Sequence, residues 1–168
     1  GRFNGIYSDT FVIPEPFFVK TGMKIYSLTD PSKKMSKSDP NPKSYVSIFD
    51  EPNVIAKKIR SAVTDSEACV RYAEGKDGVN NLMSIYSCFT GKDFGEIERE
   101  FDGRGYGDFK MAVGEACADG LAPVREEFAR LMADKAYLET VMKNGSDEAA
   151  YYARKTMSKV RRKLGFVN

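Results

Sequence analysis

The sequence predicts a mainly α-helical protein in which a helical bundle follows a short strand-and-loop segment. Two observations predict this fold class. The first fifty residues hold most of the prolines and show little helical periodicity. From Asp50 onward, apolar residues recur at steps of three and four, which is the spacing of one helix face. We therefore expect two domains, residues 1–49 and residues 50–168.

The first domain is expected to contain a short strand and an exposed loop. Residues 24–28, Lys-Ile-Tyr-Ser-Leu, alternate between polar and apolar side chains and predict a short strand. Proline-containing turns lie on either side of residues 33–39, which we therefore expect to form an exposed loop.

Four helices are expected to follow. Asp50 can cap the first helix, and Pro52 fits its first turn because a proline there gives up no helical hydrogen bond. The second helix should end at Gly91, and a short third helix comes next. The fourth and longest should run from about residue 106 to residue 133, with a kink or an interruption at Pro123.

Two further helices complete the predicted bundle. Asn144-Gly145 is expected to close the fifth helix, because glycine readily adopts the left-handed conformation that ends a helix. Ser146 is expected to cap the sixth helix, which should end at Gly165. The apolar stripe of this last helix consists of Ala150, Ala153, Met157, Val160 and Leu164.

The composition excludes several classes of function. The chain has 168 residues and no histidine, which rules out a Ser-His or Cys-His nucleophile and any imidazole metal ligand within it. The three cysteines form no C-x-x-C pair, which argues against a zinc site or a disulfide framework and fits a reducing compartment. No apolar run is long enough for a membrane span or a signal peptide. We therefore expect a cytoplasmic protein without a membrane partner.

The predicted loop carries the most informative motif of the sequence, Lys34-Met35-Ser36-Lys37-Ser38. Lysine ammonium groups are mobile point charges with three donors each, and the serine hydroxyls can also donate to phosphate oxygens. On a loop, such groups can close on a nucleotide after it has entered and stabilise charge that develops on a leaving phosphate. We therefore interpret Lys34 and Lys37 as catalytic. The alternative is a solvated linker rich in lysine and serine.

This motif resembles the signature loop of the class I aminoacyl-tRNA synthetases, and its surroundings resemble the tryptophanyl branch of bacterial type. The tyrosyl branch shares the lysine loop and is the alternative. The matching segments occur in the order expected of the tryptophanyl branch and extend over essentially the whole chain. They include Arg2-Phe3-Asn4, Phe11-Val12-Ile13-Pro14-Glu15-Pro16, Ser27-Leu28-Thr29-Asp30-Pro31, Ala62-Val63-Thr64-Asp65-Ser66, Gly78-Val79-Asn80-Asn81-Leu82 and Leu164-Gly165-Phe166-Val167.

The resemblance implies an enzyme that activates tryptophan with ATP, accompanied by Mg²⁺, and transfers it to tRNA(Trp). Lys34 and Lys37 would contact the ATP phosphates, and the backbone at Ile25 and Met35 would lie near the adenine. The implied ATP-binding residues are Ile25, Lys34, Met35, Ser36, Lys37 and Ser38. Residues 1–49 would be the end of a Rossmann-fold catalytic domain, and residues 50–168 an anticodon-binding helical domain.

Part of what the family needs is missing from this sequence. The second family signature, a His-Ile-Gly-His-like motif, cannot occur in a chain without histidine. The resemblance places that motif and the tryptophan pocket in the preceding half of the protein. We therefore expect the chain to be the C-terminal half of such an enzyme and to be inactive alone. The full-length protein is expected to be a homodimer.

Cations gather in the last predicted helix, at Arg154, Lys155, Lys159, Arg161, Arg162 and Lys163. A basic helix end can simply be a solvated face that complements the helix dipole. Clustered cations can also neutralise RNA phosphates, and the resemblance implies tRNA contact in this region. A stand-alone helical tRNA-binding module without catalysis is therefore the alternative to an enzyme fragment.

Overall fold

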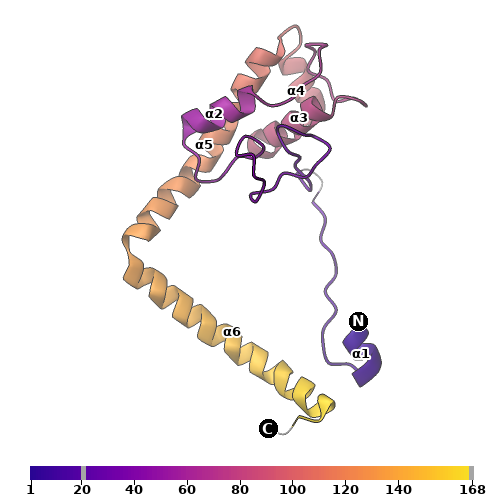
Figure 1. Cartoon of the computed structure of the whole chain (residues 1–168), viewed down its shortest axis with the longest axis vertical. Helices are drawn as coiled ribbons and strands as arrows, with labels where there is room; N and C mark the ends of the chain where they lie inside the picture. The colour runs from indigo at the N-terminus through magenta and orange to yellow at the C-terminus, as the bar shows by residue number, and fades with distance from the viewer. Residues whose placement is uncertain (20–21, 167–168) are drawn as a thin grey trace. The chain divides into compact units, whose positions relative to one another are not determined.

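The computed structural model describes residues 1–19 and 22–166, so that Val167 of the resembling C-terminal segment lies outside it. Within this range the chain forms six α-helices (Figure 1). They are α1 (Arg2–Tyr7), α2 (Pro52–Arg60), α3 (Asp77–Thr90), α4 (Phe94–Glu100), α5 (Tyr106–Ala133) and α6 (Lys135–Leu164). None of the helices in the described residues has the length and apolar character that a membrane crossing needs. The prediction of a mainly helical protein is confirmed.

The chain divides into two compact units. One unit consists of Gly1–Phe17 and Phe128–Asn168, and the other consists of Phe18–Glu127. The predicted boundary between residues 49 and 50 falls inside the second unit, so the loops before it and the helices after it pack as one body. The assignment of residues 1–49 and 50–168 to two domains stays a prediction.

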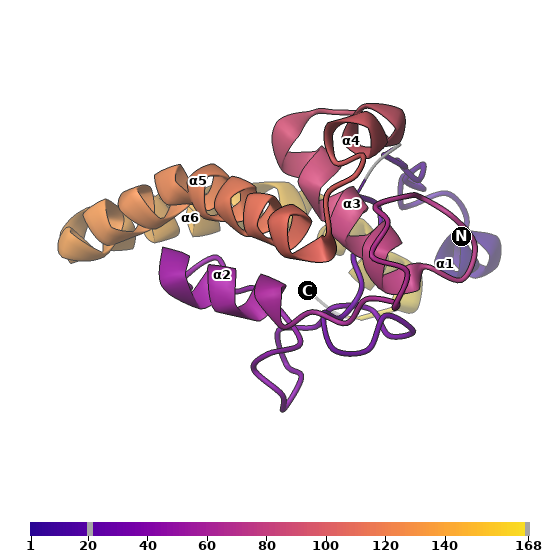
Figure 2. The same cartoon turned by 90° about the horizontal axis from the view of Figure 1, so that it is seen from above.

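The core of the unit Phe18–Glu127 lies between α2, α3, α4 and the first half of α5 (Figures 1 and 2). Each helix contributes the apolar face that its three- and four-residue spacing predicts. The side chains with no measurable exposure include Ile55, Ile59, Val79, Leu82, Ile97, Phe109 and Val113. Phe101 and Phe109 meet edge to face, with their ring centroids 5.0 Å apart. A Cβ atom on Gly114 would lie 3.3 Å from the Cα atom of Ala56, so α5 passes close to α2 there.

Local capping signals fix the ends of several helices. α3 ends at Gly91, which has a φ of 75°, as predicted. α4 begins with a capping box, in which the Asp93 carboxylate accepts from the Glu96 N–H and the Glu96 carboxylate accepts from the Asp93 N–H. The predicted cap of α2 is wrong. Glu51 precedes Pro52 without a side-chain cap, and Asp50 instead lies 2.6 Å from the Lys58 ammonium.

The predicted strand over residues 24–28 is also wrong. In the described part of the chain, the only pairing of this type is an isolated antiparallel bridge between Tyr26 and Lys34. The backbone groups of this segment find their partners in several segments rather than in one neighbouring strand. No strand of a Rossmann fold is therefore seen in the described residues.

In both long helices, the chain stays helical at a position where a break was predicted. α5 runs through Pro123 without interruption. α6 replaces the fifth and sixth predicted helices, because Gly145 lies in its interior and Ser146 caps nothing. An ion pair of 3.1 Å between Lys143 and Asp147 spans the glycine. Asn-Gly is a strong turn signal, but a glycine inside a helix costs only about 1 kcal/mol, which a helix of 30 residues can absorb.

The unit Gly1–Phe17 with Phe128–Asn168 contains α1, which the sequence pattern did not predict, and α6. The Asn4 side chain accepts from the N–H groups of Thr10 and Phe11 and so folds the following loop back onto α1. The ammonium of Lys163, near the end of α6, then donates hydrogen bonds to the hydroxyl groups of Ser8 and Thr10 in this loop. Long-range contacts of this kind leave no periodic pattern in the sequence, which explains why a helix of only six residues was missed.

Candidate functional site

The base of the lysine loop is a pairing of two backbone segments, residues 25–27 and residues 33–35. The bridge between Tyr26 and Lys34 lies at its centre. Two backbone hydrogen bonds of 2.9 Å flank it, from Ser27 N–H to the Lys33 carbonyl and from Met35 N–H to the Ile25 carbonyl. The structure therefore brings together Ile25 and Met35, the two residues whose backbone was predicted to lie near the adenine.

The pairing is fastened to the core on its inner side. Leu28 is 1% exposed, its N–H donates to the Ser44 carbonyl over 2.8 Å, and its carbonyl accepts from Val63 N–H over 2.8 Å. The side chains of Ile25 and Met35 pack against the same core. Burial of apolar side chains thus holds the base of the loop in place, while the polar residues of the motif remain outside.

Lys34 and Lys37 are both exposed. Within residues 1–19 and 22–166, neither ammonium group has a hydrogen-bond or ion-pair partner. Lys33 differs, because its ammonium lies 2.8 Å from the Asp30 carboxylate. The hydrogen bond from Lys33 holds the pKa of Asp30 down at about 2. The loop therefore presents two unneutralised positive charges, Lys34 and Lys37, to an anion.

The two serines of the motif shape the turn between the lysines. The hydroxyl groups of Ser36 and Ser38 lie 3.0 Å apart, and Ser38 N–H donates to the Ser36 hydroxyl over 3.3 Å. Asp39 N–H closes the turn on the Ser36 carbonyl. Both serines are exposed, so rotation of a hydroxyl about its Cβ–Oγ bond can redirect its proton to an incoming oxygen.

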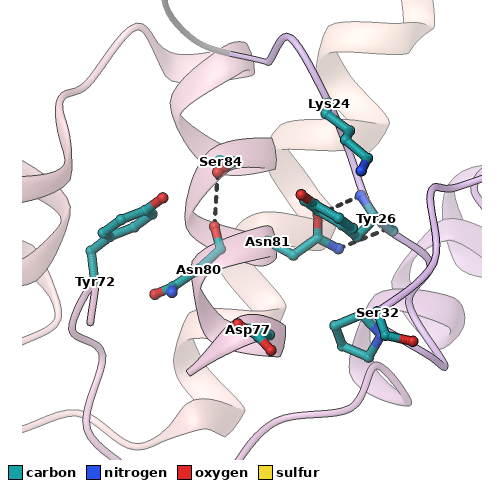
Figure 3. A pocket seen from close by; sticks show the side chains of 9 residues that line it. Lys24, Tyr26, Ser32, Tyr72, Asp77, Asn80, Asn81 and Ser84 are labelled. Atoms are coloured by element: carbon teal, nitrogen blue, oxygen red, sulfur yellow. Dashed lines mark hydrogen bonds between the residues drawn. The ribbon is translucent and has the colours of Figure 1, made fainter. Parts of the chain in front are cut away.

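A polar hollow of about 390 Å³ lies beside the base of the loop (Figure 3). Its lining consists of Lys24, Tyr26, Pro31, Ser32, Tyr72, Asp77, Asn80, Asn81 and Ser84. The two asparagine amides already bind backbone groups, Asn81 at Tyr26 and Asn80 at Ala73. These two lining side chains therefore hold backbone segments together. Sequence reasoning missed the role of these asparagines; the available signal was a pair of adjacent amides beside the apolar residues of the helix.

The predicted tRNA-binding cations differ in what they contact. Arg154, Lys155, Lys159, Arg161 and Arg162 are exposed on α6. The ammonium of Lys163 is occupied within 3.3 Å by four oxygens: the Ser8 carbonyl and hydroxyl, the Asp9 carbonyl and the Thr10 hydroxyl. Lys163 thus holds the loop after α1 against the end of α6. The prediction of phosphate contact applies best to the other five cations.

Residues 2–122 match the family of class I tRNA synthetases (W and Y). This match covers the lysine loop, the core of the unit Phe18–Glu127 and most of α5. The chain belongs to this family.

Similar proteins are found in several bacteria. The chain is 50% identical over 166 residues to a tryptophan–tRNA ligase of Clostridium tetani, covering 99% of the chain and 49% of that protein. It is 47% identical over 166 residues to the tryptophan–tRNA ligase of Clostridium acetobutylicum, with 99% of the chain and 50% of that protein covered. The chain thus spans about half the length of the relatives that it matches.

Solved structures show the same relationship. The tryptophanyl-tRNA synthetase of Mycoplasma pneumoniae is similar with a TM-score of 0.85 and 27% identity, covering 99% of this chain and 50% of that one. The enzyme of Campylobacter jejuni, complexed with ADP and tryptophan, is similar with a TM-score of 0.67 and 25% identity, covering 98% of this chain and 50% of that one. The individual ATP-binding and tRNA-binding residues stay predictions.

Proposed function

We propose that this chain is the C-terminal half of a tryptophan–tRNA ligase that works in the cytoplasm. The full protein would join tryptophan to tRNA(Trp) in two steps, with tryptophanyl-adenylate as the intermediate. The observation that carries the proposal is the pair of exposed, unneutralised lysines on a base fixed to the core. The names of the relatives favour the tryptophanyl branch over the tyrosyl branch.

In the first step, a carboxylate oxygen of tryptophan attacks the α-phosphorus of ATP. The bond from that phosphorus to the bridging oxygen breaks, and pyrophosphate leaves with additional negative charge. Lys34 and Lys37 would stabilise this charge as it develops, because ammonium groups interact most strongly with the oxygens when the charge is greatest. Ser36 and Ser38 would donate hydrogen bonds to phosphate oxygens, and the backbone at Ile25 and Met35 would lie near the adenine.

The nucleotide would bring its Mg²⁺ as part of the substrate. Among the residues that the structure describes, no three acidic or cysteine side chains lie together as metal ligands would. The metal would accompany the phosphates of ATP. The other half of the enzyme would supply the tryptophan pocket, and two full-length chains would form a homodimer.

The test uses a full-length protein, in which the N-terminal half of the enzyme precedes this chain. We expect exchange of labelled pyrophosphate into ATP that depends on tryptophan and is not supported by tyrosine. Preference for tyrosine would place the chain in the tyrosyl branch. Exchange with neither amino acid would reject the proposed activity.

A second candidate function, a stand-alone tRNA-binding module, is favoured by the five exposed cations of α6. The module would bind tRNA through phosphate contacts, so its affinity should fall steeply with salt. Binding of tRNA(Trp) by this chain alone, measured over a range of salt concentrations, tests this candidate. An absence of binding at low salt would reject it without affecting the enzyme proposal.

A further inference from the structure

We propose that Asn81 is a positioning residue for the lysine loop and sets the place from which Lys34 and Lys37 meet the nucleotide phosphates. The inference rests on the proposed function, since it concerns the same loop. Asn81 lies on α3, 4% exposed, and is far from the motif in sequence. Its amide is bound to the backbone of Tyr26, so its effect on catalysis would pass through that backbone.

Asn81 clamps the backbone of Tyr26 with both ends of its side-chain amide (Figure 3). Tyr26 N–H donates to the Asn81 Oδ1 atom over 2.8 Å, and the Asn81 Nδ2 atom donates to the Tyr26 carbonyl over 2.8 Å. The two residues are 55 positions apart. The amide thus binds the backbone in the way that a residue of a neighbouring strand would, with one donor and one acceptor.

Asn81 and the lysine segment, residues 33–35, bind opposite edges of residues 25–27. In extended chain, the N–H and C=O groups of successive residues point alternately to the two sides. The groups of Tyr26 therefore face Asn81, while the Ile25 carbonyl and the Ser27 N–H face residues 33–35. Residue 34 lies directly opposite Tyr26 in the bridge. Any displacement of Tyr26 would therefore move the backbone that presents Lys34.

The neighbouring Asn80 provides a matched control. Its amide forms the same pair of bonds with another backbone residue, accepting from Ala73 N–H over 3.1 Å and donating to the Ala73 carbonyl over 2.7 Å. Two adjacent asparagines of α3 thus hold two separate segments. Only the segment held by Asn81 leads to the lysine loop.

The experiment compares Asn81→Ala with Asn80→Ala in the full-length protein, with the active fraction determined by titration. We expect Asn81→Ala to lower kcat for tryptophan-dependent pyrophosphate exchange by about 10- to 100-fold, a range typical of small misplacements of catalytic groups. The KM for tryptophan should stay unchanged. Asn80→Ala should leave kcat within about twofold of the unmutated value, even if it lowers the Tm as much as Asn81→Ala does. A purely structural loss does not change the turnover of the molecules that remain folded.

A double-mutant cycle with Lys37→Ala adds a readout of the connection to the lysine loop. If Asn81 acts through that loop, the two substitutions together should slow exchange by much less than the product of their separate effects. Full multiplication of the two effects, or equal losses of kcat from the two asparagine variants, would overturn the inference. Should Asn81→Ala fail to fold, Asn81→Gln keeps both amide groups but places them one methylene further out, and kcat should still fall.

Hydrogen exchange of the same proteins distinguishes failure of this inference from failure of the proposed function. Peptides covering residues 25–35 should exchange faster in Asn81→Ala and at the unmutated rate in Asn80→Ala. If the unmutated full-length protein shows no pyrophosphate exchange, the proposed function fails. Separately, if Asn81→Ala leaves the hydrogen-exchange protection of residues 25–35 unchanged, the positioning role of Asn81 fails.

Discussion

The hydroxyl of Tyr106 donates a 2.6 Å hydrogen bond to the carboxylate of Asp65, which lies 41 positions earlier in the chain. The ammonium of Lys76, only 4% exposed, lies 3.0 Å from the same carboxylate and 2.8 Å from that of Glu67. Tyr106 is the first residue of α5, and Lys76 immediately precedes α3. The cluster therefore fastens the loop after α2 to the starts of two helices, and removal of Lys76 would leave two carboxylates without their shared cation.

The first prediction concerns the acid stability of this cluster. Burial opposes the charge of Asp65, but hydrogen bonds from Tyr106, the Glu67 N–H and Lys76 outweigh it and lower its pKa from 3.8 to about 2. Because the pKa is depressed in the folded state, the stabilisation is present above pH 4 and is lost as the pH falls towards 2. Asp65→Asn should lower the free energy of unfolding by about 2 kcal/mol at pH 7.

Urea unfolding at pH 7 and at pH 2.5 measures this effect. The difference between the unmutated protein and Asp65→Asn should shrink at the lower pH. Asp30→Asn is the control, because Asp30 also has a pKa of about 2 but forms an exposed pair with Lys33, which contributes little to stability. A difference for Asp65→Asn that is the same at both pH values would contradict the prediction.

The second prediction tests the continuity of α6. A Cβ atom on Gly145 would meet nothing within 4 Å, so Gly145→Ala should stabilise the protein by up to about 1 kcal/mol. Gly165 ends the helix with a φ of 76°, so Gly165→Ala should destabilise it by about 1 kcal/mol. Thermal and urea unfolding compare the two variants. Destabilisation by Gly145→Ala would mean that the helix ends there, as the Asn-Gly pair predicts.

The third prediction concerns the close approach of α3 to the segment after α2. A Cβ atom on Gly78 would overlap the carbonyl oxygen of Val63, whose N–H binds Leu28 at the base of the lysine loop. Gly78→Ala should therefore cost about 1–3 kcal/mol, the usual range for overpacking. Gly107→Ala is the control, since a Cβ atom there would meet nothing within 4 Å. Equal unfolding free energies for the two variants would refute the close approach.

The fourth prediction separates the lysines of the loop. In the full-length protein, Lys37→Ala should slow formation of the adenylate by about 10²- to 10³-fold while leaving the Kd for tryptophan nearly unchanged. Lys33→Ala should have a much smaller effect, because the charge of Lys33 is already paired with Asp30. Single-turnover kinetics and equilibrium binding of tryptophan measure the two quantities. Normal turnover after neutralisation of both Lys34 and Lys37 would remove the proposed mechanism.

The fifth prediction concerns the cations of α6. Replacing Arg154, Lys159 and Arg161 by glutamine should weaken tRNA binding and reduce the slope of log affinity against log salt by roughly one for each phosphate that is no longer neutralised. Lys143→Gln is the control, because Lys143 lies on the same helix but pairs with Asp147. An unchanged salt slope in the triple variant would show that these cations of α6 do not bind tRNA.

The sequence pattern predicted the elements whose signals are local. Gly91 ends α3, and the apolar spacing around Ile55 and Ile59 marks the buried face of α2. A helix binds its own backbone, so its pattern is complete within a few turns of chain. The lysine motif is likewise contiguous, and together with the other matching segments along the chain it indicates the family without any tertiary contact.

The tertiary structure decided the features that depend on distant partners. Residues 24–28 have the side-chain alternation of a strand, yet Tyr26 completes its backbone bonds with the side chain of Asn81. Contacts in the folded chain likewise distinguish Lys33, which is paired with Asp30, from the exposed Lys34 and Lys37. They also give Lys163 a structural role, because its ammonium binds the loop after α1. The amino-acid sequence by itself determined the buried faces of α2 to α5, the lysine motif and the family, because the signals for these lie in residues that are close together in the chain. Only the folded chain determined which groups remain free to meet a ligand, because hydrogen bonds and ion pairs form between residues that the chain brings together.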